Sequence, residues 1–167
     1  MKRVIFDTNI YGHLLQEKDI EKLQKAIREN KELTVYGYTP IRKEIRAIPK
    51  ITQLSRKTRN ALLALYDQIT SDHFLQDSEQ ISNLAECYSK RYKELGGTYS
   101  FETNIKIDFM VVACASIYGL DIVYSNDSRT LVSKIAVMAY GGVNTTVKLR
   151  TPCFYDYKKL INQLRMV

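Results

Sequence analysis

Two short apolar runs, each followed by an acidic residue, constrain the fold of this 167-residue chain more than any other feature. Val4-Ile5-Phe6 is followed directly by Asp7, and Ile122-Val123-Tyr124 is followed by Ser125-Asn126-Asp127. A short run with no polar residue predicts a strand that is buried on both faces, as in a parallel sheet. Since ligands bind outside the carboxyl ends of such strands, we expect Asp7 and Asp127 at one functional edge.

The rest of the pattern alternates between strands and helices. Further strands are predicted at 33–36 and 143–149. A helix is predicted to start at Thr39-Pro40, and others to cover 53–71, 78–95, 104–118 and about 129–140. Gly119 is predicted to cap the helix at 104–118. This order predicts a single α/β domain over residues 1–167 with a mainly parallel sheet, in which 53–97 forms a helical elaboration.

Two more carboxylates are expected near the same edge of the sheet. Glu44 lies in the first turns of the helix that follows the second strand, and Asp108 opens the helix that leads into the Asp127 strand. Four carboxylates without a His or Cys partner form a hard oxygen site, which suits Mg²⁺ or Mn²⁺ and not zinc. Such a site can hydrolyse a phosphodiester bond. Nearby, Thr8, Asn9 and Ser125 are candidates to orient the carboxylates.

Each of these acidic residues also has an ordinary structural interpretation. Asp7 can cap a turn, Asp127 can cap the next helix, and Asp108 can complement a helix dipole. Glu44 lies among basic residues, as expected for a solvated helix face. The functional hypothesis therefore depends on the four residues together, and convergence of Glu44 and Asp108 with Asp7 would favour it.

Composition narrows the range of partners and compartments. The chain has 25 Lys and Arg against 18 Asp and Glu, a net charge of +7, which favours a polyanionic partner. Three widely spaced cysteines form no CxxC pair, so neither a zinc ribbon nor a disulfide framework is predicted. No signal peptide or membrane-length apolar run is present, and we expect a cytoplasmic protein.

Four segments together resemble the motifs of PIN domains, the family named from the PilT N-terminus. They occur in the family's order, and they are Val-Ile-Phe-Asp-Thr-Asn at 4–9, Thr-Pro-Ile-Arg-Lys-Glu at 39–44, the apolar helix opened by Ile107-Asp108, and Val-Tyr-Ser-Asn-Asp at 123–127. The resemblance implies a three-layer α/β/α sandwich with four to five strands. It also implies an Mg²⁺- or Mn²⁺-dependent endoribonuclease whose catalytic and metal-binding residues are Asp7, Glu44, Asp108 and Asp127.

Many members of the PIN-domain family, which the chain resembles, are VapC-type toxins. A small antitoxin protein inhibits these toxins, and they often form dimers. The resemblance therefore implies RNA as substrate and an antitoxin and a second copy as further partners. The chain departs from the pattern in two places: the segment between Glu44 and Asp108 is longer than in a compact toxin, and Arg129-Thr130-Leu131 replaces the usual Asp-Phe.

Two other functions remain open at this point. The first is a PIN-like domain that binds RNA or a protein without cutting, although all four acidic positions are intact. The second is a receiver-like Mg²⁺-binding signalling domain. Receivers carry two adjacent acidic residues after the first strand, whereas here one Asp is followed by Thr-Asn, and Glu44 and Asp108 would have no role.

Overall fold

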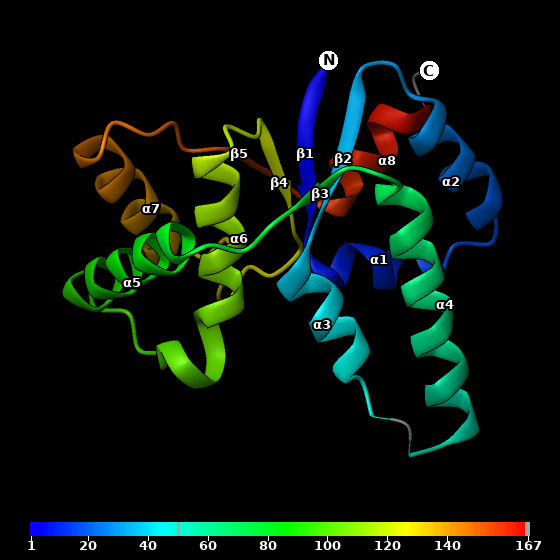
Figure 1. Cartoon of the computed structure of the whole chain (residues 1–167), viewed down its shortest axis with the longest axis horizontal. Helices are drawn as coiled ribbons and strands as arrows, with labels where there is room; N and C mark the ends of the chain where they lie inside the picture. The colour runs from blue at the N-terminus through cyan, green and yellow to red at the C-terminus, as the bar shows by residue number, and fades with distance from the viewer. Residues whose placement is uncertain (50, 166–167) are drawn as a thin grey trace.

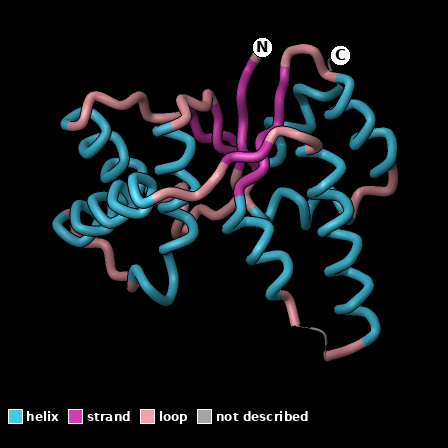
Figure 2. Tube along the Cα trace, viewed as in Figure 1, coloured by secondary structure: helices cyan, strands magenta, loops and turns pink. Residues whose placement is uncertain are grey.

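The computed structural model describes residues 1–49 and 51–165 and has a parallel sheet at its centre (Figures 1 and 2). In the described residues the sheet has five strands in the order β3-β2-β1-β4-β5, and every neighbouring pair is parallel. The strands are β1 (Lys2–Phe6), β2 (Leu33–Tyr38), β3 (Phe74–Leu75), β4 (Ile122–Tyr124) and β5 (Cys153–Tyr155). Helices cover both faces, so the predicted three-layer α/β/α sandwich with four to five mainly parallel strands is confirmed.

The chain starts in the middle of this sheet. β1 pairs with β2 on one side and with β4 on the other, and in the second pair Phe6 is opposite Tyr124. Val4, Ile5, Phe6 and Val123 are fully buried, which explains why these strands carry no polar residue. β1 and β4 therefore lie at the point where the strand order reverses, so the residues after them share one edge.

The helices form two groups on opposite sides of the sheet (Figure 1). On one side lie α1 (Thr8–Leu15), α2 (Ile20–Glu29), α4 (Gln53–Thr70) and α8 (Tyr157–Arg165), and on the other lie α5 (Glu79–Glu94), α6 (Lys106–Ile117) and α7 (Lys134–Thr146). α3 (Thr39–Ala47) continues β2 directly, and a π-helical turn (Phe101–Ile105) precedes α6. No helix in the described residues is both long enough and apolar enough to cross a membrane.

The predicted strand at 143–149 is wrong, because α7 runs to Thr146 and the outer strand is β5. The β-branched residues that suggested a strand fit a helix here, since Thr145 and Thr146 donate hydrogen bonds to the carbonyls of Gly141 and Gly142 four residues earlier. The fully buried Asn144 donates to Ser116 and Thr151 and accepts from Tyr88. These long-range bonds override the local β preference.

Three other elements differ from the prediction. The helix expected from about 129 begins only at Lys134, where the Ser133 side chain accepts from the backbone of Ala136 as N-cap. Helix α1 and the two-residue strand β3 were not predicted at all. The ends of α4, α5 and α6 lie within a few residues of the predicted ranges, and Gly119 follows α6 with a positive φ of 63°, as its predicted capping role requires.

Candidate active site

Asp7 lies at the carboxyl end of β1 and is the N-cap of α1. Its backbone N–H donates to the carbonyl of Tyr124 on β4 at 2.9 Å, which keeps it beside the next strand. One carboxylate oxygen accepts from the N–H of Thr8 at 2.8 Å, and the other accepts from the Ser125 hydroxyl at 2.8 Å and from the Asn9 amide. The side chain is therefore buried and held by the three polar residues predicted to support it.

Asp127 and Asp108 come from different elements and meet at one hydroxyl group. Asp127 follows β4, and its Oδ1 accepts the backbone N–H groups of Arg129 and Thr130 at 3.0 Å each. The Thr130 hydroxyl lies 2.6 Å from Oδ2 of Asp127 and 2.5 Å from Oδ2 of Asp108, which is in the first turn of α6. Thr130 thus joins the loop after β4 to α6.

Glu44 reaches the site from α3. The Thr8 hydroxyl donates to its carboxylate, so one threonine contacts both Asp7 and Glu44. Glu44 is only partly exposed, which contradicts the interpretation as a solvated helix face. The structure therefore brings Glu44 to the same edge of the sheet as Asp7.

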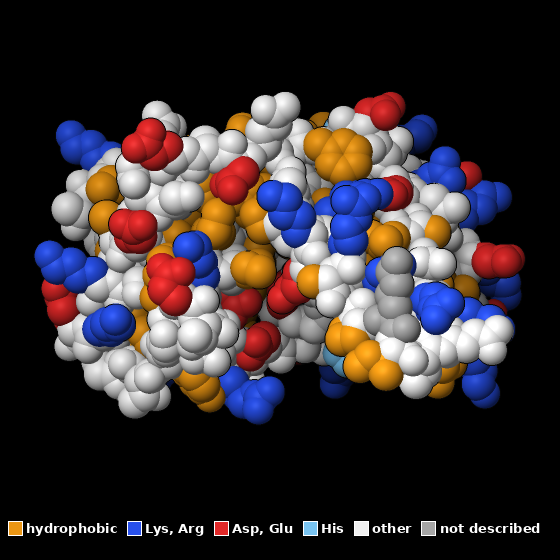
Figure 3. Space-filling model, turned by 60° about the horizontal axis from the view of Figure 1, so that its bottom comes forward, with side chains coloured by type: hydrophobic (Ala, Val, Ile, Leu, Met, Phe, Trp, Pro, Cys, Tyr) orange, Lys and Arg blue, Asp and Glu red, His pale blue; other side chains and the backbone are white. Residues whose placement is uncertain are grey.

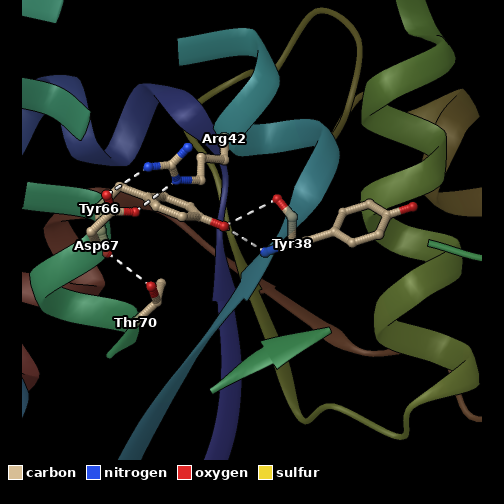
Figure 4. Close-up of polar contacts among 5 residues, drawn as sticks. All are labelled: Tyr38, Arg42, Tyr66, Asp67 and Thr70. Atoms are coloured by element: carbon tan, nitrogen blue, oxygen red, sulfur yellow. Dashed lines mark hydrogen bonds and ion pairs between the residues drawn. The ribbon is translucent and has the colours of Figure 1, made fainter. Parts of the chain in front are cut away.

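Helix α3 is held in place by α4, which Figure 4 shows in detail. The buried Tyr66 hydroxyl accepts from the backbone N–H of Tyr38 at 2.7 Å and donates to its carbonyl at 3.1 Å, at the junction between β2 and α3. Arg42 forms two 2.8 Å bonds to Asp67, the next residue of α4. Since Arg42 and Glu44 lie on opposite sides of α3, this anchoring turns Glu44 toward the site.

Burial and neighbouring negative charges raise the pKa values of two carboxyl groups in the site. Burial raises the pKa of Asp7 to about 6, and the negative charges of Glu44 and Asp127 add to this effect. Burial likewise raises the pKa of Asp108 to about 7, with contributions from Asp7, Asp127 and Glu44. All four acidic residues thus act on one another electrostatically, and acidic side chains gather in a hollow between the two halves of the molecule, with Lys and Arg around it (Figure 3).

The hydroxyl of Thr130 lies between two of the crowded carboxylates. A hydroxyl has one proton, so it donates to only one of the two carboxylates that it contacts. The other contact needs a proton on a carboxyl group, and the raised pKa of Asp108, about 7, favours a proton there. The site therefore contains more negative charge than its hydrogen bonds can compensate.

The donor set suits a hard divalent cation, because it consists of carboxylate and hydroxyl oxygens. In residues 1–49 and 51–165, however, no three Asp, Glu, His or Cys side chains are grouped closely enough to hold a metal ion as they stand. The hydroxyl groups of Thr8 and Thr130 donate to carboxylates of the cluster and lie beside them. The chemistry of the oxygens fits a cation, and the bridging hydroxyls would have to give way to it.

The purely structural roles considered for Asp7 and Asp127, the capping of a turn or helix, are found only in part. Asp7 does cap α1, but with one oxygen, and Asp127 closes a turn and not α7, whose cap is Ser133. Thr130 was not predicted as a site residue. Its sequence signal was available, because a hydroxyl residue three positions after an acidic residue often binds it locally, but its contact with Asp108 depends on the tertiary fold.

Comparisons with known proteins support the fold. No protein-family model and no curated protein sequence matches this chain. A chain in the crystal structure of VapBC2 from Rickettsia felis, bound to a DNA fragment from its promoter, superposes with a TM-score of 0.60 at 8% identity, over 92% of this chain and 98% of that one. A chain of FitAB bound to an IR36 DNA fragment gives a TM-score of 0.51 at 12% identity, over 92% and 94%. The chain therefore has the PIN-like α/β/α fold that its four motifs predict, and shares it with chains of the VapBC2 and FitAB structures.

Proposed function

We propose that the protein is an Mg²⁺- or Mn²⁺-dependent endoribonuclease whose active site consists of Asp7, Glu44, Asp108 and Asp127. The observation that carries this proposal is the convergence of four carboxylates from four elements at the carboxyl edge of the sheet, where two of them have raised pKa values. A protein that needed these residues only for capping would gain nothing from crowding their charges. A receiver-like domain would leave Glu44 and Asp108 unused.

The residues divide into roles according to their contacts. Asp7 and Asp127 would hold the cation and Asp108 would complete or position its site. Glu44, next to the Thr8 hydroxyl, would bind a second cation or orient the attacking water. A bound divalent cation supplies charge to polarise the phosphate and to lower the pKa of the bound water. Asn9 and Ser125 keep the Asp7 carboxylate aimed at the site. The basic surplus of the chain favours an RNA backbone across the acidic hollow.

The comparisons support a place in a toxin–antitoxin pair. VapBC2 and FitAB are toxin–antitoxin complexes, and their matching chains are covered almost completely. We therefore include a small antitoxin protein among the partners of this chain, with self-association into a homo-oligomer as a second expectation. Co-expression with the product of an adjacent small gene, followed by co-purification and measurement of the molar mass by light scattering, tests both.

The activity is tested with labelled structured and unstructured RNAs, and with DNA of the same sequences, in Mg²⁺, Mn²⁺ or EDTA. The decisive variant is Asp7→Asn, because Asn caps a helix as well as Asp and preserves α1 while it removes the charge. Asp121→Asn is the matched control, since Asp121 precedes β4 at the opposite edge of the sheet. Cleavage should require the metal, persist in Asp121→Asn and vanish in Asp7→Asn. RNA binding without cleavage under every metal would instead support the non-catalytic module.

A further inference from the structure

A second hollow lies next to the acidic site and shares one residue, Asp127, with the four-carboxylate cluster. It has a volume of about 290 Å³ and is lined by Asn9, His13, Asn126, Asp127, Ser128 and Arg129. These residues come from α1 and from the loop after β4. Asp127 belongs to both the hollow and the acidic site, so a polymer whose phosphate lies on the acidic site would pass directly into the hollow.

The wall of this hollow is built from polar groups that hold one another. The imidazole of His13 stacks on the ring of Tyr157 with a centroid distance of 5.1 Å and an interplanar angle of 27°. The Asn126 amide nitrogen lies 2.9 Å from Nε2 of His13, and its amide oxygen accepts the backbone N–H of Tyr157 at 2.8 Å. The Tyr157 hydroxyl donates to Glu17 at 3.0 Å. Three segments distant in sequence therefore fix the position of one imidazole.

The same wall is connected to the Asp7 carboxylate. The backbone N–H of Asn126 donates to the amide oxygen of Asn9 at 3.0 Å, and the Asn9 amide nitrogen contacts Ser125 at 3.2 Å and also donates to Asp7. Asn126 is thus bonded directly to Asn9, which orients Asp7, and His13 is connected to Asn9 through Asn126. A ligand that touches His13 or Asn126 would therefore lie close to the residues that hold Asp7.

We propose that this hollow binds the nucleoside next to the scissile phosphate of the RNA substrate, with His13 and Asn126 contacting its base and Arg129 its phosphate. The inference rests on the proposed function. Beyond its bonds to His13 and Tyr157, the Asn126 amide keeps one N–H and one oxygen lone pair, which can meet the edge of an unpaired base. Tyr157 stacks on one face of the His13 ring, so the opposite face is the one that can stack on a base. The volume of about 290 Å³ is at the lower end for ligand pockets and suits one nucleotide unit. Arg129 is exposed and supplies the positive charge of the lining.

Nucleotide binding can be measured by NMR without any cleavage. The chain has only two histidines, so the imidazole signals of the hollow are easily distinguished. Each of the four ribonucleoside 5′-monophosphates is titrated in Mg²⁺ while the imidazole NMR signals are followed. The His13 signals should shift with at least one nucleotide, and those of the exposed His73, beside Tyr36 on the β3 side, should not. The exposed variant Arg129→Gln should weaken binding of the monophosphate about tenfold and that of the uncharged nucleoside far less. Equal shifts at both histidines, or none, would overturn the proposal.

Specificity is tested by cutting an RNA pool of random sequence and sequencing the ends. The natural protein should prefer particular bases at one position flanking the cut, and His13→Ala and Asn126→Ala should reduce that preference about tenfold, with His73→Ala as the control that keeps it. An unchanged preference in both pocket variants would refute the base contacts. If no RNA is cut although the His13 signals shift, the pocket stands and the proposed nuclease fails.

Discussion

Replacing Asp108 by Asn is expected to stabilise the metal-free protein above neutral pH, although the side chain is partly buried. Its carboxylate is surrounded by the charges of Asp7, Asp127 and Glu44, and burial is the main cause of its raised pKa of about 7. Among the described residues its one hydrogen-bond partner is the Thr130 hydroxyl, which can rotate to donate to an amide oxygen. The substitution therefore removes an unfavourable charge and retains the shape and the contact.

The size of the effect follows from the pKa. A rise from 3.8 to about 7 means that the folded protein binds this proton more tightly than the unfolded chain. Stability is therefore lost as pH rises from about 4 to about 7, and the loss is complete above pH 7. At 1.36 kcal/mol per pKa unit the upper limit is about 4 kcal/mol. Because the neighbouring carboxylates share the strain and relax with it, we expect Asp108→Asn to gain about 1–3 kcal/mol at pH 8 and almost nothing at pH 4.

The assay is urea unfolding in EDTA at pH 4, 6 and 8, which gives the free energy of unfolding at each pH. Asp121→Asn is the control of opposite sign. The Arg3 backbone N–H, which donates to Asp121 at 2.8 Å, and Arg150 lower the pKa of that carboxyl, so its loss should destabilise the protein at pH 8. Opposite responses of two Asp→Asn changes cannot come from a general effect of the substitution.

The same measurement in saturating Mg²⁺ separates charge crowding from metal binding. The natural protein should gain stability, by about 2.7 kcal/mol at a concentration of one hundred times Kd, and Asp108→Asn should gain much less. If Asp108→Asn is less stable than the natural protein at pH 8 in EDTA, or if the two show the same pH profile, Asp108 does not carry the charge strain inferred from the structure. The electrostatic account of the site would then be wrong.

Three predictions concern the scaffold around the site. Tyr66→Phe should cost about 1–3 kcal/mol in urea unfolding, because it leaves the N–H of Tyr38 without its partner, and it should lower cleavage more than binding, because α3 carries Glu44. Gly37→Ala should cost about 1–3 kcal/mol, since its Cβ would lie 2.7 Å from the Tyr66 hydroxyl oxygen and 2.9 Å from the Phe74 ring, and an unchanged free energy of unfolding would contradict this clash. Asn144→Ala should lower the thermal midpoint by several degrees, because it removes three hydrogen bonds, two of them fully buried, and an unchanged midpoint would show that water replaces them.

The sequence alone determined the centre of the sheet and the composition of the acidic cluster. Val4-Ile5-Phe6 and Ile122-Val123-Tyr124 are apolar throughout because both faces of β1 and β4 are covered, and such burial leaves a direct trace in the sequence. Asp7 and Asp127 follow these strands, so the topology of a parallel sheet places them at one edge. The helices α4, α5 and α6 were predictable because their buried faces repeat at helical spacing.

Other features were decided only by contacts between distant residues. Residues 143–146 are helical because the buried Asn144 finds partners on α6 and in the segment after α7, and no local preference contains that information. Thr130 contacts Asp108, Tyr66 holds the junction before α3, and Asn126 links His13 to Tyr157, each over more than twenty residues of sequence. A hydrogen bond of this kind depends on where two elements pack. The residue types that could act were therefore visible in the sequence, while the charge crowding and the neighbouring hollow arise only when the sheet and its two layers of helices assemble.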